Sequence, residues 1–281
     1  MPIAHLRDLD LSYEVTGDGP PLLLVAGTGF PGSTWTPPVV RAFARDFTVI
    51  TYDHRGTGTT PLGDEPLSTR LLAADAVALL EHLGLAPAHV LGHSFGGRVA
   101  QWMALDRPDA LRSLVLAASG AGRPGVTPTD VQAAVDSNRD RIAADGLAGF
   151  MHHSIYGFFF SAEGLEKHPE VVQALKDGFV AGQPSDEAFL AHVVARQEHS
   201  TLHLLDRVAT RTLVLVGKAD TGAMANGSHL EQSLAIAERI ADAELVVLPR
   251  LRHALLWEEP ELVTRVVREW VARGEQGPPL R

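Results

Sequence analysis

Residues 92–97 read GHSFGG, and the architecture of the chain can be worked out from the two segments that flank this turn. The apolar run AHVLG (88–92) precedes the turn and the helical pattern RVAQWMALD (98–106) follows it, so G-x-S-x-G lies at a predicted strand-to-helix turn. Neighbouring strand and helix crowd such a turn, which explains glycine at positions 92 and 96. We expect the turn to hold the Ser94 hydroxyl at a helix N-terminus, where the Phe95 backbone N–H faces any anion that forms.

Short apolar runs alternate with amphipathic helical patterns on both sides of the turn. The predicted strands are 11–15, 22–26, 47–52, 89–92, 113–117, 212–217 and 244–248, and predicted helices include 68–84, 230–240 and 261–272. This alternation predicts an α/β fold, with a mostly parallel central sheet of about eight strands and helices on both faces. The turn signal Gly17-Asp18-Gly19-Pro20 also predicts an antiparallel hairpin between the first two of these strands.

The alternation of strands and helices stops between about residues 120 and 210. A Gly/Pro-rich segment, SGAGRPGVTP (119–128), opens this stretch, and helical patterns without a strong strand pattern follow it. We therefore predict a core formed by residues 1–120 and 211–281, interrupted by a helical cap, or lid, at 121–210.

Composition limits the partners and chemistry of the protein. The 281 residues include 34 acidic and 24 basic side chains, for a net charge of −10, which disfavours nucleic acid and anionic membranes as partners. The absence of cysteine excludes thiolate catalysis and cysteine-ligated metals. The N-terminal segment lacks the apolar block of a signal peptide, so we expect a cytoplasmic protein, either a monomer or a homodimer.

A serine hydroxyl needs an adjacent base, which is itself oriented by an acid. Asp220 directly follows the predicted strand segment TLVLVGKA, and His253 lies in the loop PRLRHALLWEEP after the predicted strand ELVVL. Side chains that follow strands of a parallel sheet gather at one edge, so we expect Ser94, Asp220 and His253 to meet there. We interpret His93, beside the serine, as a structural histidine.

The loop GTGFPGS (27–33) follows the strand LLLVA and allows two interpretations. The first is G-x-G-x-x-G with Asp53 at a later strand end, the fingerprint of a dinucleotide site. Phe30-Pro31 opposes it, because this pair is bulky and lacks one N–H donor where backbone should hold a pyrophosphate. In the second interpretation, which we favour, the loop aims the Phe30 backbone N–H at Ser94 as an oxyanion donor, and no cofactor is required.

His199 and His203 are four residues apart, a spacing that could place two imidazoles on one helix face as metal ligands. No third ligand is evident in the sequence. We therefore favour a solvated cap helix and predict no metal.

The chain resembles the α/β-hydrolase superfamily over nearly its whole length. The resemblance rests on the GTGFPGSTW loop, DHRGTGTT after the third predicted strand, GHSFGG, the acid of GKAD and the RHALLWEEP loop. It implies a helical cap over the site and structural bracing by 53–56. Thr28 replaces a histidine usual in the family, so the support of the oxyanion loop must differ. A serine nucleophile distinguishes the chain from the dehalogenases and soluble epoxide hydrolases of the family, which use aspartate.

These features predict a serine hydrolase that cleaves a small, mainly apolar ester or lactone through an acyl-enzyme. Predicted substrate contacts are Thr28, Gly29, Trp35, Tyr156 and Phe159, although aromatic residues of the cap could equally be core. The fold leaves C–C bond hydrolysis, perhydrolysis of the haloperoxidase type and lyase reactions open. A ligand-binding protein with an idle triad is the remaining alternative.

Overall fold

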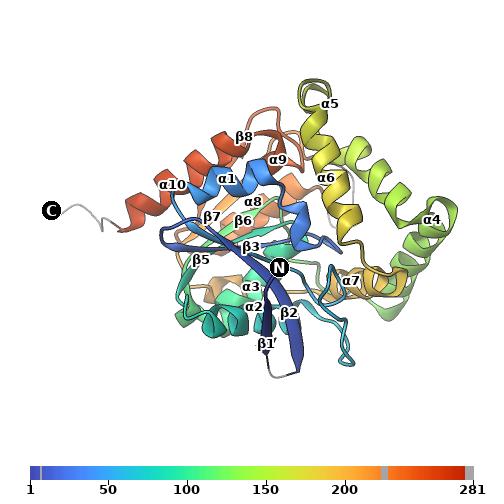
Figure 1. Ribbon diagram of the computed structural model, residues 1–281, viewed down its shortest axis with the longest axis horizontal. Coiled ribbons are helices and arrows are strands. Elements are labelled where there is room, and N and C mark those ends of the chain that lie inside the picture. Colours follow the sequence, from blue (N-terminus) through green and yellow to red (C-terminus); the bar gives the residue numbers. More distant parts are fainter. Residues whose placement is uncertain (7, 223–226, 276–281) are drawn as a thin grey trace.

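The computed structural model describes residues 1–6, 8–222 and 227–275. It confirms the predicted fold class, because eight strands form one sheet in the order β1-β2-β4-β3-β5-β6-β7-β8 (Figure 1). The strands are β1 (Ile3–Leu6), β2 (Leu9–Thr16), β3 (Pro21–Val25), β4 (Thr48–Tyr52), β5 (Ala88–His93), β6 (Leu111–Ala117), β7 (Thr212–Gly217) and β8 (Glu244–Leu248). The β1–β2 and β2–β4 pairs are antiparallel, and the remaining pairs are parallel.

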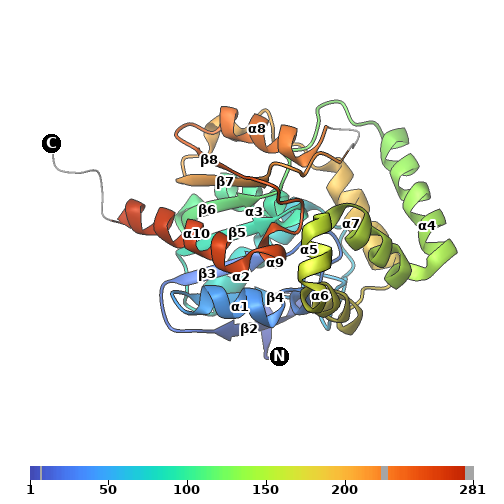
Figure 2. The ribbon, with the colours of Figure 1, turned by 90° about the horizontal axis from the view of Figure 1, so that it is seen from above.

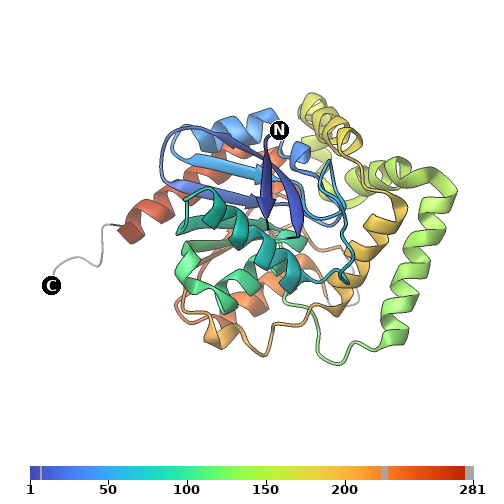
Figure 3. The ribbon, with the colours of Figure 1, turned by 60° about the horizontal axis from the view of Figure 1, so that its bottom comes forward.

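Helices cover both faces of the sheet, as Figures 2 and 3 show. One face carries α1 (Pro37–Ala44), α9 (Leu255–Glu258) and α10 (Pro260–Glu275), and the other carries α2 (Thr69–His82), α3 (Phe95–Asp106) and α8 (His229–Arg239). Side chains alternate between the two cores along β3, with Leu22 and Leu24 on one side and Leu23 and Val25 on the other. Burial on both faces is the reason why these strands read as unbroken apolar runs. Of the helices in the described ranges, none is long and apolar enough to cross a bilayer.

The segment between β6 and β7 is helical, and Figures 1 and 2 show its helices together at one end of the sheet. Its elements are α4 (Pro128–Ser154), a π-helical turn (Ile155–Phe159), α5 (Ala162–Lys167), α6 (Pro169–Ala181) and α7 (Asp186–Glu198). Phe150, Phe179 and Phe189 of these helices join the hydrophobic core on the α1 face of the sheet. The inserted helices are therefore packed onto the core and held at the end of the sheet where the site lies.

The predicted hairpin at Gly17-Asp18-Gly19-Pro20 is wrong. The turn joins β2 to β3, but β4 lies between these strands and pairs with both of them. Thr48 holds the turn instead, since the Gly19 N–H donates to Thr48 Oγ1 at 3.0 Å and the Thr48 N–H donates to the Pro20 carbonyl at 3.0 Å. The hairpin partner of β2 is β1, on the edge of the sheet. Turn residues fix a local change of direction, whereas strand pairing depends on what packs between the strands.

Candidate active site

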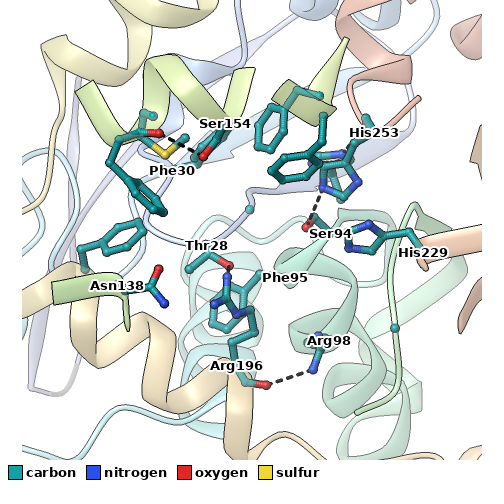
Figure 4. Close-up of a pocket in the computed structure, with 18 of the residues that line it drawn as sticks. Thr28, Phe30, Ser94, Phe95, Arg98, Asn138, Ser154, Arg196, His229 and His253 are labelled. Atoms are coloured by element: carbon teal, nitrogen blue, oxygen red, sulfur yellow. Dashed lines mark hydrogen bonds between the residues drawn. The ribbon is translucent and has the colours of Figure 1, made fainter. Parts of the chain in front are cut away.

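A hydrogen-bonded chain joins Ser94, His253 and Asp220 at the carboxyl ends of β5, β7 and β8. Figure 4 shows its Ser94–His253 bond. The distance from Ser94 Oγ to His253 Nε2 is 3.0 Å, and that from His253 Nδ1 to Asp220 Oδ2 is 2.8 Å. The structure thus brings together the three side chains that the sequence analysis selected. A carboxylate only accepts hydrogen bonds, so Nδ1 carries the imidazole proton and Nε2 is left to accept the hydrogen of the serine hydroxyl.

The backbone of the turn explains how Ser94 is presented. Ser94 has φ 55° and ψ −116°, and it lies directly before the first residue of α3. A Cβ on Gly96 would overlap the Val25 carbonyl oxygen, and one on Gly92 would overlap the Gly96 carbonyl. The turn therefore holds Ser94 in a strained conformation and packs directly on the backbone of β3. Glycine is required at positions 92 and 96 because a side chain there would overlap backbone atoms.

We expect Gly96→Ala to lower the free energy of unfolding by more than about 2 kcal/mol, because neither the backbone of the serine turn nor that of Val25 in β3 can move aside. In a protein of this size the midpoint of thermal unfolding should fall by at least about 4 °C. The matched control is Gly157→Ala, whose added Cβ would meet no atom within 4 Å. Equal midpoints for the two variants would contradict this account of the turn.

Asp220 is the ionised member of the chain. Burial by itself raises the pKa of this carboxyl, but the charge of His253 and hydrogen bonds from His229 and His253 outweigh it, so the pKa falls well below its ordinary value. Leu230 also fixes the loop, since its N–H donates to the Asp220 carbonyl at 3.1 Å. The carboxylate is thus available throughout the physiological pH range to hold the His253 ring.

His229, at the start of α8, is a site residue that the sequence analysis missed. Its Nδ1 lies 3.3 Å from Asp220 Oδ1, and its ring stacks on that of His253 with centroids 4.1 Å apart. Burial, and next the charge of His253, lower the pKa of His229 to about 4, so its ring is neutral beside His253. No motif marks this histidine, because only the return of α8 over β7 brings it to Asp220. Asp220, His229 and His253 are also the one group of side chains in the described ranges close enough to hold a metal ion.

The loop after β3 is held largely by the inserted helix α7. The Gly29 N–H donates to His192 Nδ1 at 3.4 Å, and the Arg196 guanidinium donates to Thr28 Oγ1 at 3.5 Å. The His192 Nε2–H donates to the Arg55 carbonyl at 2.8 Å, which fixes the tautomer of that ring. Two side chains from the insertion thus support the loop in which Thr28 stands in place of histidine.

The two predicted oxyanion donors, the backbone N–H groups of Phe95 and Phe30, differ in their hydrogen bonds in this structure. The Phe95 N–H opens α3 and has no hydrogen-bond partner among the described residues, as expected for the first residue of a helix. The Phe30 N–H donates to the Gly27 carbonyl at 3.1 Å and would have to share or release that turn bond to serve an oxyanion. Of these two predicted donors, that of Phe95 is therefore the one without a partner among the described residues.

Several histidines around the loop are buried and uncharged. Burial, followed by the charge of His192, lowers the pKa of His54 to about 3, and burial lowers the pKa of His192 to about 4. His93 is likewise buried, with its pKa lowered by burial and by His253, and its Nε2–H donates to the His253 carbonyl at 2.9 Å. This bond gives His93 the structural role that we predicted, since it positions the loop of His253.

These buried histidines predict a loss of stability in mild acid. Below about pH 6.5 these imidazoles bind a proton in the unfolded chain but stay neutral in the folded protein. The free energy of unfolding is therefore highest above pH 6.5 and decreases as the pH falls towards 4. Each of His54, His192 and His229 contributes up to about 1.4 kcal/mol per pH unit in that window. Urea midpoints at pH 7.5, 6.0 and 5.0 measure the slope. His192→Gln should flatten this slope, because glutamine takes up no proton in this range, and a wild-type midpoint independent of pH would contradict the prediction.

A cavity of about 290 Å³ opens on the Ser94 hydroxyl and combines aromatic and polar walls. Its aromatic lining consists of Phe30, Phe95, Phe150, Phe158, Phe159 and Phe189, contributed by the core and by the inserted helices. Arg98, Arg196 and Gln232 are polar lining residues that the sequence analysis did not select. The volume is close to the lower limit of typical ligand pockets, so a small ligand fits.

Of the predicted substrate contacts, Thr28 and Phe159 line the cavity and the other three do not. Trp35 is 4% exposed and stacks on Trp257 with centroids 5.2 Å apart, so it belongs to the core under α1. Tyr156 is 46% exposed and packs against His152 on the outside of the insertion. The sequence shows that a residue is aromatic but not which way its side chain points.

The structure also gives the glycine-rich loop a purpose other than dinucleotide binding. The Gly32 N–H donates to Asp53 Oδ1 at 2.7 Å, and the Thr59 N–H donates to Asp53 Oδ2 at 3.1 Å. Asp53 is 2% exposed, so backbone amides occupy the carboxylate that would bind a ribose. The bracing expected of residues 53–56 includes Arg55, which donates to Asp75 at 2.7 and 2.8 Å.

The predicted solvated pair His199 and His203 does not form on a helix face. Helix α7 ends at Glu198, and His199 is extended and 3% exposed. Its ring nitrogens each lie 2.9 Å from a hydroxyl, Nδ1 from that of Thr69 and Nε2 from that of Thr201. His199 is therefore a buried structural histidine, and the expectation of a solvated ring was wrong.

Comparisons with known proteins agree with this geometry. A family model for the alpha/beta hydrolase fold matches residues 20–260. The putative carbamate hydrolase RutD of Azorhizobium caulinodans is 27% identical over 267 residues, which cover 95% of this chain and 97% of that protein. A malate-bound thermophilic esterase from Thermogutta terrifontis superposes with a TM-score of 0.80 at 28% identity, covering 94% of both chains. Est816, an N-acyl homoserine lactone degrading enzyme, superposes with a TM-score of 0.78 at 25% identity over 96% of this chain and all of the other.

The family match spans the strands β3 to β8, the inserted helices and the positions of Ser94, Asp220 and His253. The strand order and the serine turn described above agree with it. The protein is a hydrolase of the α/β-hydrolase fold family.

Proposed function

We propose that the protein is a serine hydrolase that cleaves a small ester or lactone through an acyl-enzyme. The observation that carries the proposal is the unbroken chain from Ser94 Oγ through His253 to Asp220, at the floor of a cavity. Related proteins support this class of substrate, since one is an esterase and another degrades N-acyl homoserine lactones.

In the proposed mechanism, His253 Nε2 takes the hydroxyl proton as Ser94 Oγ attacks the substrate carbonyl carbon. The carbonyl oxygen becomes an oxyanion that accepts hydrogen bonds from the Phe95 N–H and, once its turn bond is shared, the Phe30 N–H. The tetrahedral intermediate then expels the alkoxide, which receives the proton from His253 and leaves an ester on Ser94. A water molecule, deprotonated by His253, attacks that ester, and collapse of the second intermediate releases the acid and returns the proton to Ser94.

The test combines active-site labelling with a substrate panel. We expect a fluorophosphonate probe to modify Ser94, as identified by peptide mass spectrometry. We also expect turnover of p-nitrophenyl acetate and butyrate, or of small lactones, to exceed that of long acyl chains because the cavity is small. Three further assays test the other reactions of the fold. They use a carbamate for carbamate hydrolysis, a vinylogous diketone for C–C bond hydrolysis, and the formation of a peracid for perhydrolysis. Absence of an adduct on the folded protein, with equal rates for wild type and Ser94→Ala, would support the ligand-binding alternative.

A further inference from the structure

Three arginines line the cavity: Arg141, which is exposed and packs over the Phe150 ring, and two others, Arg98 and Arg196. Arg98 lies in the first turn of α3, four residues after Ser94, and is 7% exposed; Arg196 reaches the cavity from α7. Arg98 Nη1 donates to the Arg196 carbonyl at 2.9 Å and Nη2 to Gln232 Oε1 at 3.5 Å, while Arg196 Nη1 donates to Thr28 Oγ1 at 3.5 Å. Each of these acceptors is neutral.

Neither the Arg98 nor the Arg196 guanidinium forms an ion pair with any carboxylate in the described parts of the chain, and no described aspartate or glutamate lines the cavity. Arg55 provides an internal comparison, because it is 2% exposed and its guanidinium is paired with Asp75. Acidic residues are abundant in this protein, which has a net charge of −10. Where a buried arginine serves the fold, the chain supplies a carboxylate; in the cavity it supplies none.

The cavity therefore carries uncompensated positive charge. Burial, and next the charge of Arg196, lower the pKa of Arg98 to about 9, and burial lowers the pKa of Arg196 to about 10. The partial positive charge at the N-terminus of α3 has the same sign. Arg98 is buried and Arg196 is partly buried, so this positive charge favours an anion, since an unpaired buried charge is costly and a charge-assisted hydrogen bond relieves that cost.

We propose that Arg98 and Arg196 bind a carboxylate of the substrate, so that the enzyme acts on half-esters of small dicarboxylic acids or on lactones that carry a free acid. This inference rests on the proposed function of Ser94. Figure 4 shows both arginines on the side of Ser94 away from His253, so a short substrate can present its ester to the serine and its acid to the guanidiniums. A planar carboxylate matches the fork of a guanidinium, and a cavity of about 290 Å³ admits a small half-ester.

The test compares substrates that differ only in the remote charge. Monoethyl and diethyl esters of succinic, glutaric and adipic acid are assayed by ethanol release. For the diacid that fits best, we expect kcat/KM of the anionic monoester to exceed that of the neutral diester by about ten- to a hundredfold. Arg98→Gln and Arg196→Gln should each lower this ratio about tenfold, whereas Arg196→Lys should keep part of it. The control Arg70→Gln removes a surface arginine paired with Asp106 and should leave the ratio unchanged.

Binding measured without turnover separates this inference from the proposed function. In Ser94→Ala, calorimetry should give a Kd for monoethyl glutarate about tenfold tighter than for diethyl glutarate, and Arg196→Gln in that background should remove the difference. If Ser94 is labelled and diesters are hydrolysed but the monoester has no advantage, the carboxylate inference is overturned and the hydrolase stands. If nothing is labelled or hydrolysed while the monoester still binds through Arg196, the proposed function fails and the anion site stands. Tighter binding of ethyl 4-phosphonobutanoate than of monoethyl glutarate would overturn the choice of carboxylate.

Discussion

Ser94→Ala is expected to lower kcat about a millionfold on the best substrate, which is the loss that follows removal of a serine nucleophile acting with its base. The variant should retain its fold, because the Ser94 side chain makes one hydrogen bond, to His253, while the strained turn is held by Gly92 and Gly96. Rates are measured on enzyme whose thermal unfolding matches that of wild type, and the fluorophosphonate adduct should disappear.

The control for this loss is Ser154→Ala, a second serine that lines the same cavity. Its Oγ donates to the Phe150 carbonyl within α4 at 3.0 Å and forms no hydrogen bond with His253 in the structure. It should lose far less activity than Ser94→Ala. Comparable rates for the two variants, or wild-type turnover by Ser94→Ala, would show that the reaction does not pass through Ser94.

Asp220→Asn is expected to lower kcat about ten-thousandfold while leaving the protein folded. The amide that replaces the carboxylate can direct N–H groups at His253 Nδ1, which favours the tautomer with the proton on Nε2. That nitrogen then cannot accept the Ser94 proton, and the imidazolium formed during attack loses the negative charge 2.8 Å away. The loss should appear in kcat at saturating substrate, since Asp220 does not line the cavity.

A second buried acid serves as the matched control for Asp220. Asp75 is paired with Arg55 on the bracing loop and lies outside the cavity. Asp75→Asn leaves a buried guanidinium with less compensation, so we expect lower stability with a largely retained kcat in the folded fraction. Urea unfolding and initial rates of both variants separate the two effects. A similar loss of kcat in Asp75→Asn would show that acids act here through general destabilisation.

The candidate nucleophile, base and acid could be located without the structure because each follows a strand. Parallel strands deliver their carboxyl ends to one edge, so the positions after AHVLG, TLVLVG and ELVVL converge whatever the details of packing. The G-x-S-x-G turn carries a local steric requirement that is written directly in its glycines. In the structure His253 forms hydrogen bonds with both Ser94 and Asp220, and these local rules predict that the three residues meet.

Residues whose position depends on helix packing could not be located in this way. His229 reaches Asp220 because α8 packs over β7, and His192 and Arg196 reach the loop after β3 because α7 folds back from the insertion. Trp35 and Tyr156 were selected as aromatic residues near the site, yet one packs in the core and the other faces solvent.

The sequence by itself determined where most strands lie along the chain, the serine turn, and the acid and base that follow later strands, since periodicity, glycine sterics and strand ends are local properties. The tertiary structure alone decided which turn forms a hairpin, which histidines are neutral, and that Arg98 and Arg196 line the cavity without a carboxylate. Those features are set by the burial of one element against another, and burial is a property of the packed chain rather than of any segment in it.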